Sequence, residues 1–499
     1  MTLEQALAKM KELQAAQQAY NHAMGVLSLD GETAAPSASA RGRAETMGYL
    51  SGVTYQLLVN DEVNEALQTI LAHRDQVSPV QARQAELLKE DYDDSVRIPM
   101  EEYVAYSSLL TNAGAVWHEA KEKNDYPAFA PYLQQIIDFN RKFAAYKDAT
   151  KPAYDVLLDG FEKGASTATL DPFFGLLRDK LSPVILEVAG RPAPEDAFLK
   201  QRFPLQDQRA FSDRLMQMMG IPRDRCNIGE TEHPFTTNFN KWDVRITTNY
   251  HEGDVADSLY SVIHEGGHAL YELGTADEIQ FTNLASGASM GLHESQSRFY
   301  ENLIGRSLPF CRALLPVMQE CFPTQMQGVT AEMLYAAVNK SRPSLIRTAA
   351  DELTYGQHVA IRYEMEKLMI SGDARVEELP AEWNRLYKEY LGVVVPNDRE
   401  GILQDVHWSG GMLGYFPSYA LGSAYGVQML AAMEKDFDPW GDVEKADLSR
   451  ITAWLGEKIH RHGRMLTPPA LLQNAIGGPF DPECYVQYLT KKFTDLYKL

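Results

Sequence analysis

Hydrophobic residues recur at intervals of three and four along most of the chain, which is the spacing of an amphipathic α-helix. In the first 220 residues the pattern predicts successive helices, the first with Leu3, Ala6 and Met10 on one face. Prolines punctuate these helices at Pro36, Pro79, Pro99, Pro152 and Pro172. Two stretches have the composition of loops, 33–40 (TAAPSASA) and 190–197 (GRPAPEDA), and the second is the best candidate for a linker.

The pattern changes between residues 227 and 250. The segments 233–239 (HPFTTNF) and 242–250 (WDVRITTNY) are rich in β-branched and aromatic residues and flank a turn-like Asn240–Lys241 pair, so they predict a small antiparallel sheet. Helical periodicity then returns at 331–340, 347–369, 381–391, 419–433 and 448–462. The predicted fold class is therefore mainly α, with one small sheet just before residues 261–274.

Residues 261–274, SVIHEGGHALYELG, combine a helical hydrophobic stripe with the pattern HExxH. Residues four apart lie on the same face of a helix, about 6 Å apart along its axis, so His264 and His268 can bind one metal ion. Glu265 is placed beside a water on that ion. Gly266 and Gly267 each cost roughly 1 kcal/mol relative to alanine inside a helix, so we expect them to make room for substrate or for a packed neighbour.

Catalytic zinc usually takes three protein ligands, so a third must come from elsewhere. Gly274 stands where a metzincin would have its third histidine, which excludes that class. Glu294 follows His268 by 26 residues at the start of a predicted helix and is the favoured ligand. Glu301 is the alternative, whereas Glu272 would have to coordinate from the same straight helix.

Composition narrows the functional classes. The net charge is −21 and no basic run is present, which argues against a nucleic-acid or membrane-surface partner. The N-terminus lacks a signal-peptide pattern and no segment is apolar enough to span a membrane, so we expect a cytoplasmic protein. The four scattered cysteines form no CxxC pair and are expected to be reduced.

Six short motifs occur in order across 176 residues, and together they resemble the carboxypeptidase Taq family of metallocarboxypeptidases. They are HPF (233–235), DVRIT (243–247), HEGGH (264–268), HESQSR (293–298), IRTAAD (346–351) and GILQDVHW (401–408). The resemblance implies a nearly all-helical body with a long groove. We therefore expect residues 1–499 to form one catalytic domain, in which 1–200 wall the groove and 201–499 carry the metal and substrate sites.

The resemblance also implies an activity: removal of C-terminal residues from peptides with broad side-chain preference, by a homodimer. It implies one divalent metal held by His264, His268 and Glu294, with Glu265 as the base that activates a metal-bound water. Zinc is the first expectation, and cobalt and manganese suit the same ligands. The alternatives are a metallo-oligopeptidase that cuts internally and a non-catalytic metal-binding scaffold, and Glu265 argues against the scaffold.

A carboxypeptidase must recognise a terminal carboxylate, which a planar guanidinium can bind through two hydrogen bonds. Arg347 and Arg245 are the candidates, with Arg347 ahead; the structural alternatives are pairs with Asp351 and Asp243. His233 is a further candidate for a substrate contact.

The developing oxyanion also needs a donor. His407 is the first candidate, because Gln404, Asp405 and Trp408 are expected to orient it. Three tyrosines in the aromatic run that follows, Tyr415, Tyr419 and Tyr425, are further candidates for this donor, and Tyr419 is the one chosen. Near the metal, His293 is expected to support a ligand, and Asp351 or Glu352 to hydrogen-bond the histidines.

Overall fold

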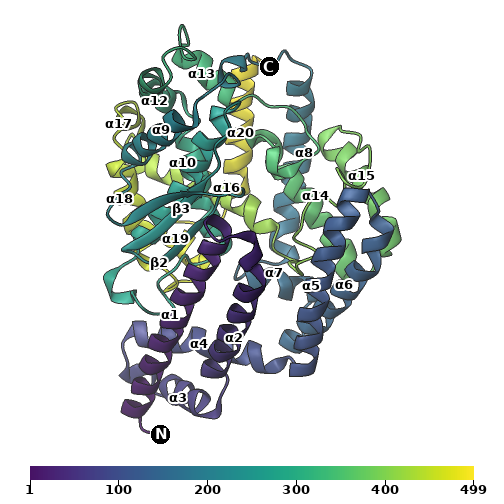
Figure 1. The fold of residues 1–499 in the computed structure, drawn as a ribbon, viewed down its shortest axis with the longest axis vertical. Coiled ribbons are helices and arrows are strands. Elements are labelled where there is room, and N and C mark those ends of the chain that lie inside the picture. Colours follow the sequence, from purple (N-terminus) through teal and green to yellow (C-terminus); the bar gives the residue numbers. More distant parts are fainter.

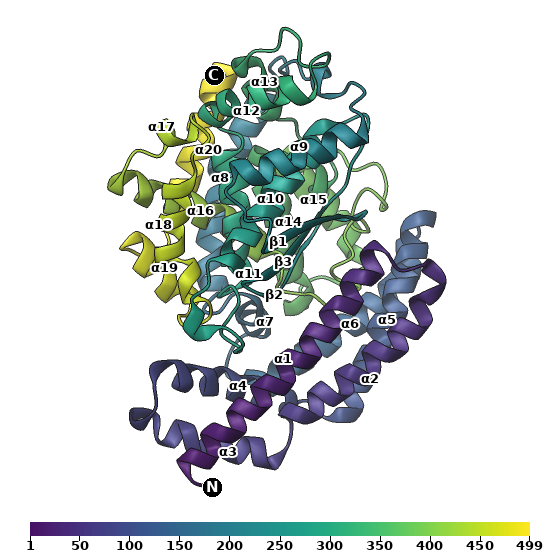
Figure 2. The ribbon, with the colours of Figure 1, turned by 60° about the vertical axis from the view of Figure 1, so that its left-hand side comes forward.

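The computed structural model describes residues 1–499 and contains 20 α-helices and three β-strands, which confirms the mainly α fold class. Helices α1–α4 lie at one end of the molecule, with the N-terminus at the tip (Figures 1 and 2). The other helices surround the small sheet and α10. No helix combines the length and the apolar character needed to cross a bilayer.

The ends of several of the first nine helices coincide with the prolines that were expected to separate them. Pro79 opens α4 behind a capping box formed by Ser78 and Gln81, and Pro99 and Pro152 immediately precede α5 and α7. Pro172 is different, because it lies inside α8. The helices are α1 (Leu3–Thr33), α2 (Ala40–Leu58), α3 (Asp61–Ala72), α4 (Pro79–Arg97), α5 (Met100–Lys123), α6 (Tyr126–Asp148), α7 (Ala153–Phe161), α8 (Thr167–Ala189) and α9 (Leu205–Met218).

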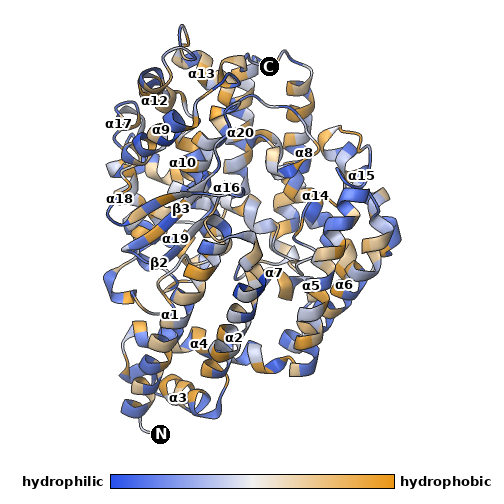
Figure 3. Ribbon diagram, in the orientation of Figure 1, coloured by the Kyte–Doolittle hydropathy of each residue, from blue (hydrophilic) through white to orange (hydrophobic).

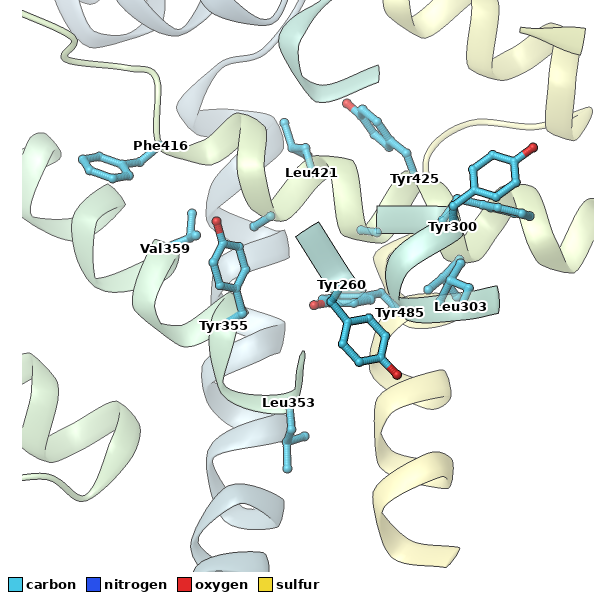
Figure 4. Packing of buried hydrophobic residues seen from close by; sticks show 14 of the residues in the cluster. Tyr260, Tyr300, Leu303, Leu353, Tyr355, Val359, Phe416, Leu421, Tyr425 and Tyr485 are labelled. Carbon is cyan, nitrogen blue, oxygen red and sulfur yellow. The ribbon is translucent and has the colours of Figure 1, made fainter. Parts of the chain in front are cut away.

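One large hydrophobic core and two smaller ones stabilise the chain, and the smallest contains only Leu87, Ile279 and Leu284. The main core contains 96 buried residues from Leu109 to Tyr497, among them the tyrosines drawn in Figure 4. Helices α1, α3 and α4 bury a second core of nine residues, running from Ala6 to Leu88. Most helices carry hydrophobic and hydrophilic residues together, as amphipathic surface helices do (Figure 3).

The sheet is mixed, which corrects the prediction of a purely antiparallel one. Strands β2 (Thr236–Asn240) and β3 (Asp243–Thr248) form the expected antiparallel hairpin. Strand β1 (Cys226–Glu230) pairs parallel to β3 on its other edge, giving the order β1-β3-β2. The prediction missed β1 because its five residues, CNIGE, contain little of the β-branched and aromatic character that marks a strand.

After the sheet, the predicted helices occur with their ends shifted by a few residues. The largest shift concerns 347–369, because Arg347–Ala349 form a 3₁₀ turn and the helix begins at Glu352. The helices are α10 (Val255–Leu273), α11 (Met290–Arg298), α12 (Leu308–Cys321), α13 (Ala331–Val338), α14 (Glu352–Ser371), α15 (Leu379–Leu391), α16 (Pro417–Asp436), α17 (Trp440–Val443), α18 (Ser449–Lys458), α19 (Pro468–Ile476) and α20 (Pro482–Tyr497).

Glycines let α10 and α16 approach α11 closely from two sides. A Cβ on Gly267 of α10 would lie 2.6 Å from the carbonyl oxygen of Gln296 in α11. A Cβ on Gly422 of α16 would lie 2.8 Å from the Cβ of Glu294. Gly266 instead faces Met219 and Ile221. Both glycines of the HExxH helix therefore make room for packed neighbours and not for substrate.

We expect Gly267→Ala to destabilise the protein by about 1–3 kcal/mol, because the added methyl group forces the α10 and α11 backbones apart. Gly456→Ala in α18 is the control, since a Cβ there would meet nothing within 4 Å. It should be neutral or stabilise by about 0.5–1 kcal/mol through its higher helix propensity. Denaturant unfolding measures both, and equal effects of the two substitutions would contradict the packing argument.

Candidate active site

His264 and His268 of α10 and Glu294 of α11 converge on one point. Oε2 of Glu294 lies 3.7 Å from Nε2 of His264 and 3.6 Å from Nε2 of His268. The three ligand atoms all lie within 4.8 Å of one another. Ligands about 2.0–2.2 Å from a tetrahedral zinc ion are separated by about 3.3–3.6 Å, so this donor set fits such an ion.

The other ring nitrogen of each histidine is held by a neighbour. Nδ1 of His264 lies 2.8 Å from Oε2 of Glu301. Nδ1 of His268 lies 2.6 Å from Nδ1 of His293, whose Nε2 lies 2.7 Å from Oε1 of Glu272. Such partners fix the ring orientation of metal-binding histidines. Glu301 and Glu272, the competing ligand candidates in the sequence, hydrogen-bond His264 and His293 respectively, and His293 in turn contacts His268.

Two arginines neutralise the carboxylates of this cluster. Arg298 donates to Oε1 of Glu294 at 2.8 Å and to Oε2 of Glu301 at 3.1 Å, and Arg306 donates to Oε1 of Glu301 at 3.1 Å. Burial alone would raise the pKa of Glu294, but Arg298 and His264 outweigh it and hold that pKa well below its usual range. Glu294 therefore stays ionised, as a metal ligand must.

Glu265 lies on the same helix and is oriented by the sheet. The hydroxyl group of Thr236, the first residue of β2, donates to Oε2 of Glu265 at 2.6 Å. Burial raises the pKa of Glu265, while His264 and the Thr236 hydroxyl oppose the rise. A carboxylate with a raised pKa and one oxygen tied down suits a group that accepts a proton on the other oxygen.

His264, Glu265 and Glu294 line an open cleft of about 780 Å³. The segment between α8 and α9, which includes the predicted linker 190–197, contributes Asp196, Leu199 and Lys200 to the lining. Asp196 pairs with Lys340 at 2.9 Å, and Lys200 pairs with Asp254, the N-cap of α10. The predicted linker is therefore held to the rest of the chain by at least one ion pair.

The candidate arginines have different surroundings. Arg347 lines the cleft, is 5% exposed, and donates to Oδ1 of Asp405 through Nε at 3.1 Å and Nη2 at 2.9 Å. Arg245 lies outside the cleft lining and forms a two-bond pair with Asp243, both distances 2.8 Å. His233 is exposed in the loop before β2.

His407 and Tyr419 lie together, with Nε2 of His407 3.3 Å from the Tyr419 hydroxyl. Burial and the nearby Arg347 lower the pKa of His407 to about 4, so the ring is neutral at pH 7. Tyr419 lines the cleft, whereas His407 is not among its lining residues. Tyr425 lies apart from them and hydrogen-bonds Glu162.

The residues expected to orient His407 form their hydrogen bonds with other groups. Asp405 pairs with Arg347 and Arg362, Gln404 accepts from the Arg347 backbone amide, and Trp408 donates to Glu366. Asp351 and Glu352 likewise make no hydrogen bond to the metal-site histidines. Asp351 caps α14, and Glu352 pairs with Lys492.

Comparison with known proteins decides the family. The model for "Carboxypeptidase Taq (M32) metallopeptidase" matches residues 9–493. Carboxypeptidase 1 of Bacillus subtilis is 39% identical over 96% of each chain, and thermostable carboxypeptidase 1 of Pyrococcus furiosus is 36% identical over 99% of this chain and 98% of its own. The chain belongs to the carboxypeptidase Taq family.

Solved structures of carboxypeptidases have the same fold. An M32 carboxypeptidase from Deinococcus radiodurans superposes with a TM-score of 0.95 at 35% identity over 99% of both chains. Metallocarboxypeptidase 1 of Trypanosoma cruzi gives 0.94 at 31% identity over 99% of this chain and 100% of its own. This carboxypeptidase Taq protein is thus a metallocarboxypeptidase and a hydrolase, and the family implies a divalent metal.

Several site residues of this carboxypeptidase were not predicted from the sequence. Arg298 follows Glu294 by four residues, so helical spacing alone could have suggested their contact. Thr236 comes directly after the HPF motif, but nothing local indicates that it reaches Glu265. Arg306 follows Glu301 by five residues, a spacing that the π-helical segment Phe299–Ile304 brings together and that the sequence does not reveal. Arg362 lacks a local signal, because Asp405 lies 43 residues away along the chain and meets it only through tertiary packing.

We expect Asp405→Asn to destabilise the protein by about 3 kcal/mol at pH 7, because Arg347 and Arg362 are left as buried charges without a carboxylate. Those arginines hold the pKa of Asp405 below its usual range despite burial. Its stabilisation is therefore present above pH ~4 and lost as the pH falls further. Urea unfolding should show a difference from the wild type that shrinks in acid.

Asp243→Asn is the matched control for this prediction. It breaks a pair with Arg245 that is one-third exposed and should cost no more than about 1 kcal/mol. An Asp405→Asn effect as small as that of the control would show that the buried pair contributes no more than an exposed one.

Proposed function

We propose that this metallocarboxypeptidase releases C-terminal residues from peptides with broad side-chain preference. The observation that carries the proposal is one cleft lined by two of the three metal-site residues, by Glu265 and by Arg347. That two of the candidate metal ligands, the candidate base and the candidate carboxylate-binding cation line the same cleft supports this proposal. An oligopeptidase that cuts internally would not need the arginine.

We infer that His264, His268 and Glu294 hold one divalent ion, with zinc as the first expectation. Two histidines and a carboxylate also suit cobalt or manganese. When bound, the ion supplies Lewis-acid chemistry, by which it acidifies water and polarises a carbonyl oxygen. The chain's own contribution is to keep Glu294 ionised through Arg298 and to keep both histidine rings aligned through Glu301 and His293.

Glu265 is proposed as the general base. Thr236 occupies Oε2, which leaves Oε1 to take the proton of the attacking water and then deliver it to the leaving amine. The position of Glu265 between the two histidines, buried and oriented, supports this role over a non-catalytic scaffold, which would need no base there.

Arg347 is proposed to bind the substrate carboxylate. Three of the five N–H groups of its guanidinium are used by Asp405 and Tyr355, so two are left to donate. Arg245 uses two of its N–H groups on Asp243 and lies outside the cleft lining, and this position supports Arg347 over Arg245. His233, exposed beside the cleft residue Pro234, is kept as a substrate contact at the entrance.

Tyr419 is proposed as the donor to the oxyanion, since its hydroxyl lies in the cleft. His407 is neutral at pH 7, and its Nε2 lies 3.3 Å from that hydroxyl. We propose that Nε2–H donates to the hydroxyl oxygen, which holds Tyr419 in position and leaves the hydroxyl proton for the oxyanion. Burial raises the pKa of Tyr419, which keeps it protonated and able to donate.

The cellular setting is also a proposal. We infer a cytoplasmic homodimer that acts on peptides, with neither nucleic acid nor membrane as a partner. We keep residues 1–499 as one catalytic domain, in which 1–200 wall the groove and 201–499 bind metal and substrate. Asp196 and Lys200 line the cleft, which supports the contribution of residues 1–200 to its wall, and the net charge of −21 supports the absence of a nucleic-acid or membrane-surface partner.

We expect Glu265→Gln to retain the metal but lose at least about 10³-fold in kcat, because the isosteric amide keeps the Thr236 contact but cannot accept the proton. Metal content by atomic absorption and single-peptide turnover measure the two properties separately. A variant that keeps its metal and a substantial part of its turnover would exclude Glu265 as the base.

Arg347→Ala should slow cleavage of a free-acid peptide by about 10²-fold, through loss of a charge-assisted pair with the terminal carboxylate. Mass spectrometry of one peptide and its C-terminally amidated twin measures the effect. The wild type should produce a C-terminal ladder from the free acid only. Amide cleavage at an equal rate would point to the oligopeptidase.

Arg245→Ala is the parallel variant and should leave the preference for the free acid unchanged. Arg347→Lys keeps a positive charge beside Asp405, so it separates loss of recognition from loss of folding. If Arg245→Ala and not Arg347→Ala abolished the preference, the two roles would be exchanged.

A further inference from the structure

The position of Glu294 depends on the position of α11. This helix has nine residues, continues directly into the π-helical segment Phe299–Ile304, and is packed between α10 and α16 through Gly267, Gly422 and Gly426. These glycines fix how close the neighbouring backbones come. They have no side chains to interlock with α11, so they do little to prevent movement along its axis.

A buried carboxylate from a distant part of the chain meets the start of α11. Glu162 directly follows α7 and is 3% exposed. Its Oε1 accepts from the Ser289 hydroxyl at 2.9 Å, and its Oε2 accepts from the Gly291 amide at 2.9 Å. The Tyr425 hydroxyl of α16, the helix that flanks α11, lies 3.5 Å from Oε1.

Each contact of Glu162 lies at the first turn of α11 or beside it. Ser289 is the N-cap, whose oxygen also accepts from the Leu292 amide at 3.1 Å. Gly291 must be a glycine for this contact, since a Cβ there would lie 2.7 Å from Oε2. No lysine, arginine or histidine hydrogen-bonds the carboxylate, and burial raises the pKa of Glu162 to about 7. The positive end of the α11 dipole compensates the negative charge of Glu162.

We propose that Glu162 is a positioning residue for the metal site, which fixes α11 along its axis so that Glu294 meets His264 and His268. The inference rests on the proposed metal ligands. One residue of an α-helix rises about 1.5 Å, whereas metal–ligand distances tolerate about 0.2 Å. A small axial shift of α11 is therefore enough to weaken coordination by Glu294.

The chain contains a matched control in Glu366 of α14. This carboxylate is fully buried, its pKa is also raised by burial to about 7, and it accepts three hydrogen bonds, from Tyr154, Trp408 and Gly414. None of these partners belongs to α10 or α11. Removing Glu366 thus disturbs a comparable buried carboxylate without releasing the metal-site helix.

The test is zinc affinity, measured by competition with a chromogenic chelator at constant pH on Glu162→Ala, Glu366→Ala and the wild type. Glu162→Ala should bind zinc about tenfold more weakly, the lower limit for residues that support metal ligands. Glu366→Ala should stay within about twofold of the wild type. Glu162→Gln should recover most of the affinity, because its carbonyl can accept from Gly291 and its amide can donate to Ser289.

Wild-type affinity in Glu162→Ala, or an equal loss in Glu366→Ala, would overturn the proposal. If Glu162→Ala does not fold, Ser289→Ala removes one contact of Glu162 and should weaken zinc binding several-fold; unchanged affinity there overturns the proposal as well. A wild type that binds no zinc would instead refute the proposed metal site.

Discussion

The close approach of three helix backbones is the constraint on which the site depends. Gly267 and Gly422 bring α10 and α16 against α11, so that two histidines on one helix and a glutamate on another share one small volume. A helix interior normally avoids glycine because it lowers helix stability. Here the lower helix stability is offset by close packing against α11, which no larger residue permits at Gly267 or Gly422. The relative positions of His264, His268 and Glu294 follow from this close approach of the backbones.

Buried charge is distributed around that contact in pairs. Arg298 forms an ion pair with Glu294, and Arg306 forms one with Glu301. His264 contacts Glu301, while His268 contacts His293, which in turn contacts Glu272. Each ionised group thus has a partner that makes its burial tolerable. The same pairs leave the side chains of His264, His268 and Glu294, the proposed ligands, with little freedom to rotate.

Sequence reasoning succeeded where the signal is local and failed where it is not. The HExxH helix, the β2–β3 hairpin and the late helices have their own periodicity. Helix geometry favoured Glu294, which lies close to both histidines, and its role as a ligand stays a prediction. Strand β1 is too short to show a pattern. Thr236 contacts Glu265 across 29 residues of chain, and Glu162 contacts Gly291 of α11 across 129 residues. Asp405 was linked to its neighbour His407, although tertiary packing directs it to Arg347.

Asp405 is shared by Arg347 and Arg362, so one carboxylate compensates two guanidinium groups and a unit of positive charge is left at that end of the cleft. The protein as a whole carries −21. The positive charge of this triad is therefore local and opposite in sign to the charge of the whole molecule, and its low-dielectric surroundings preserve the field that it produces.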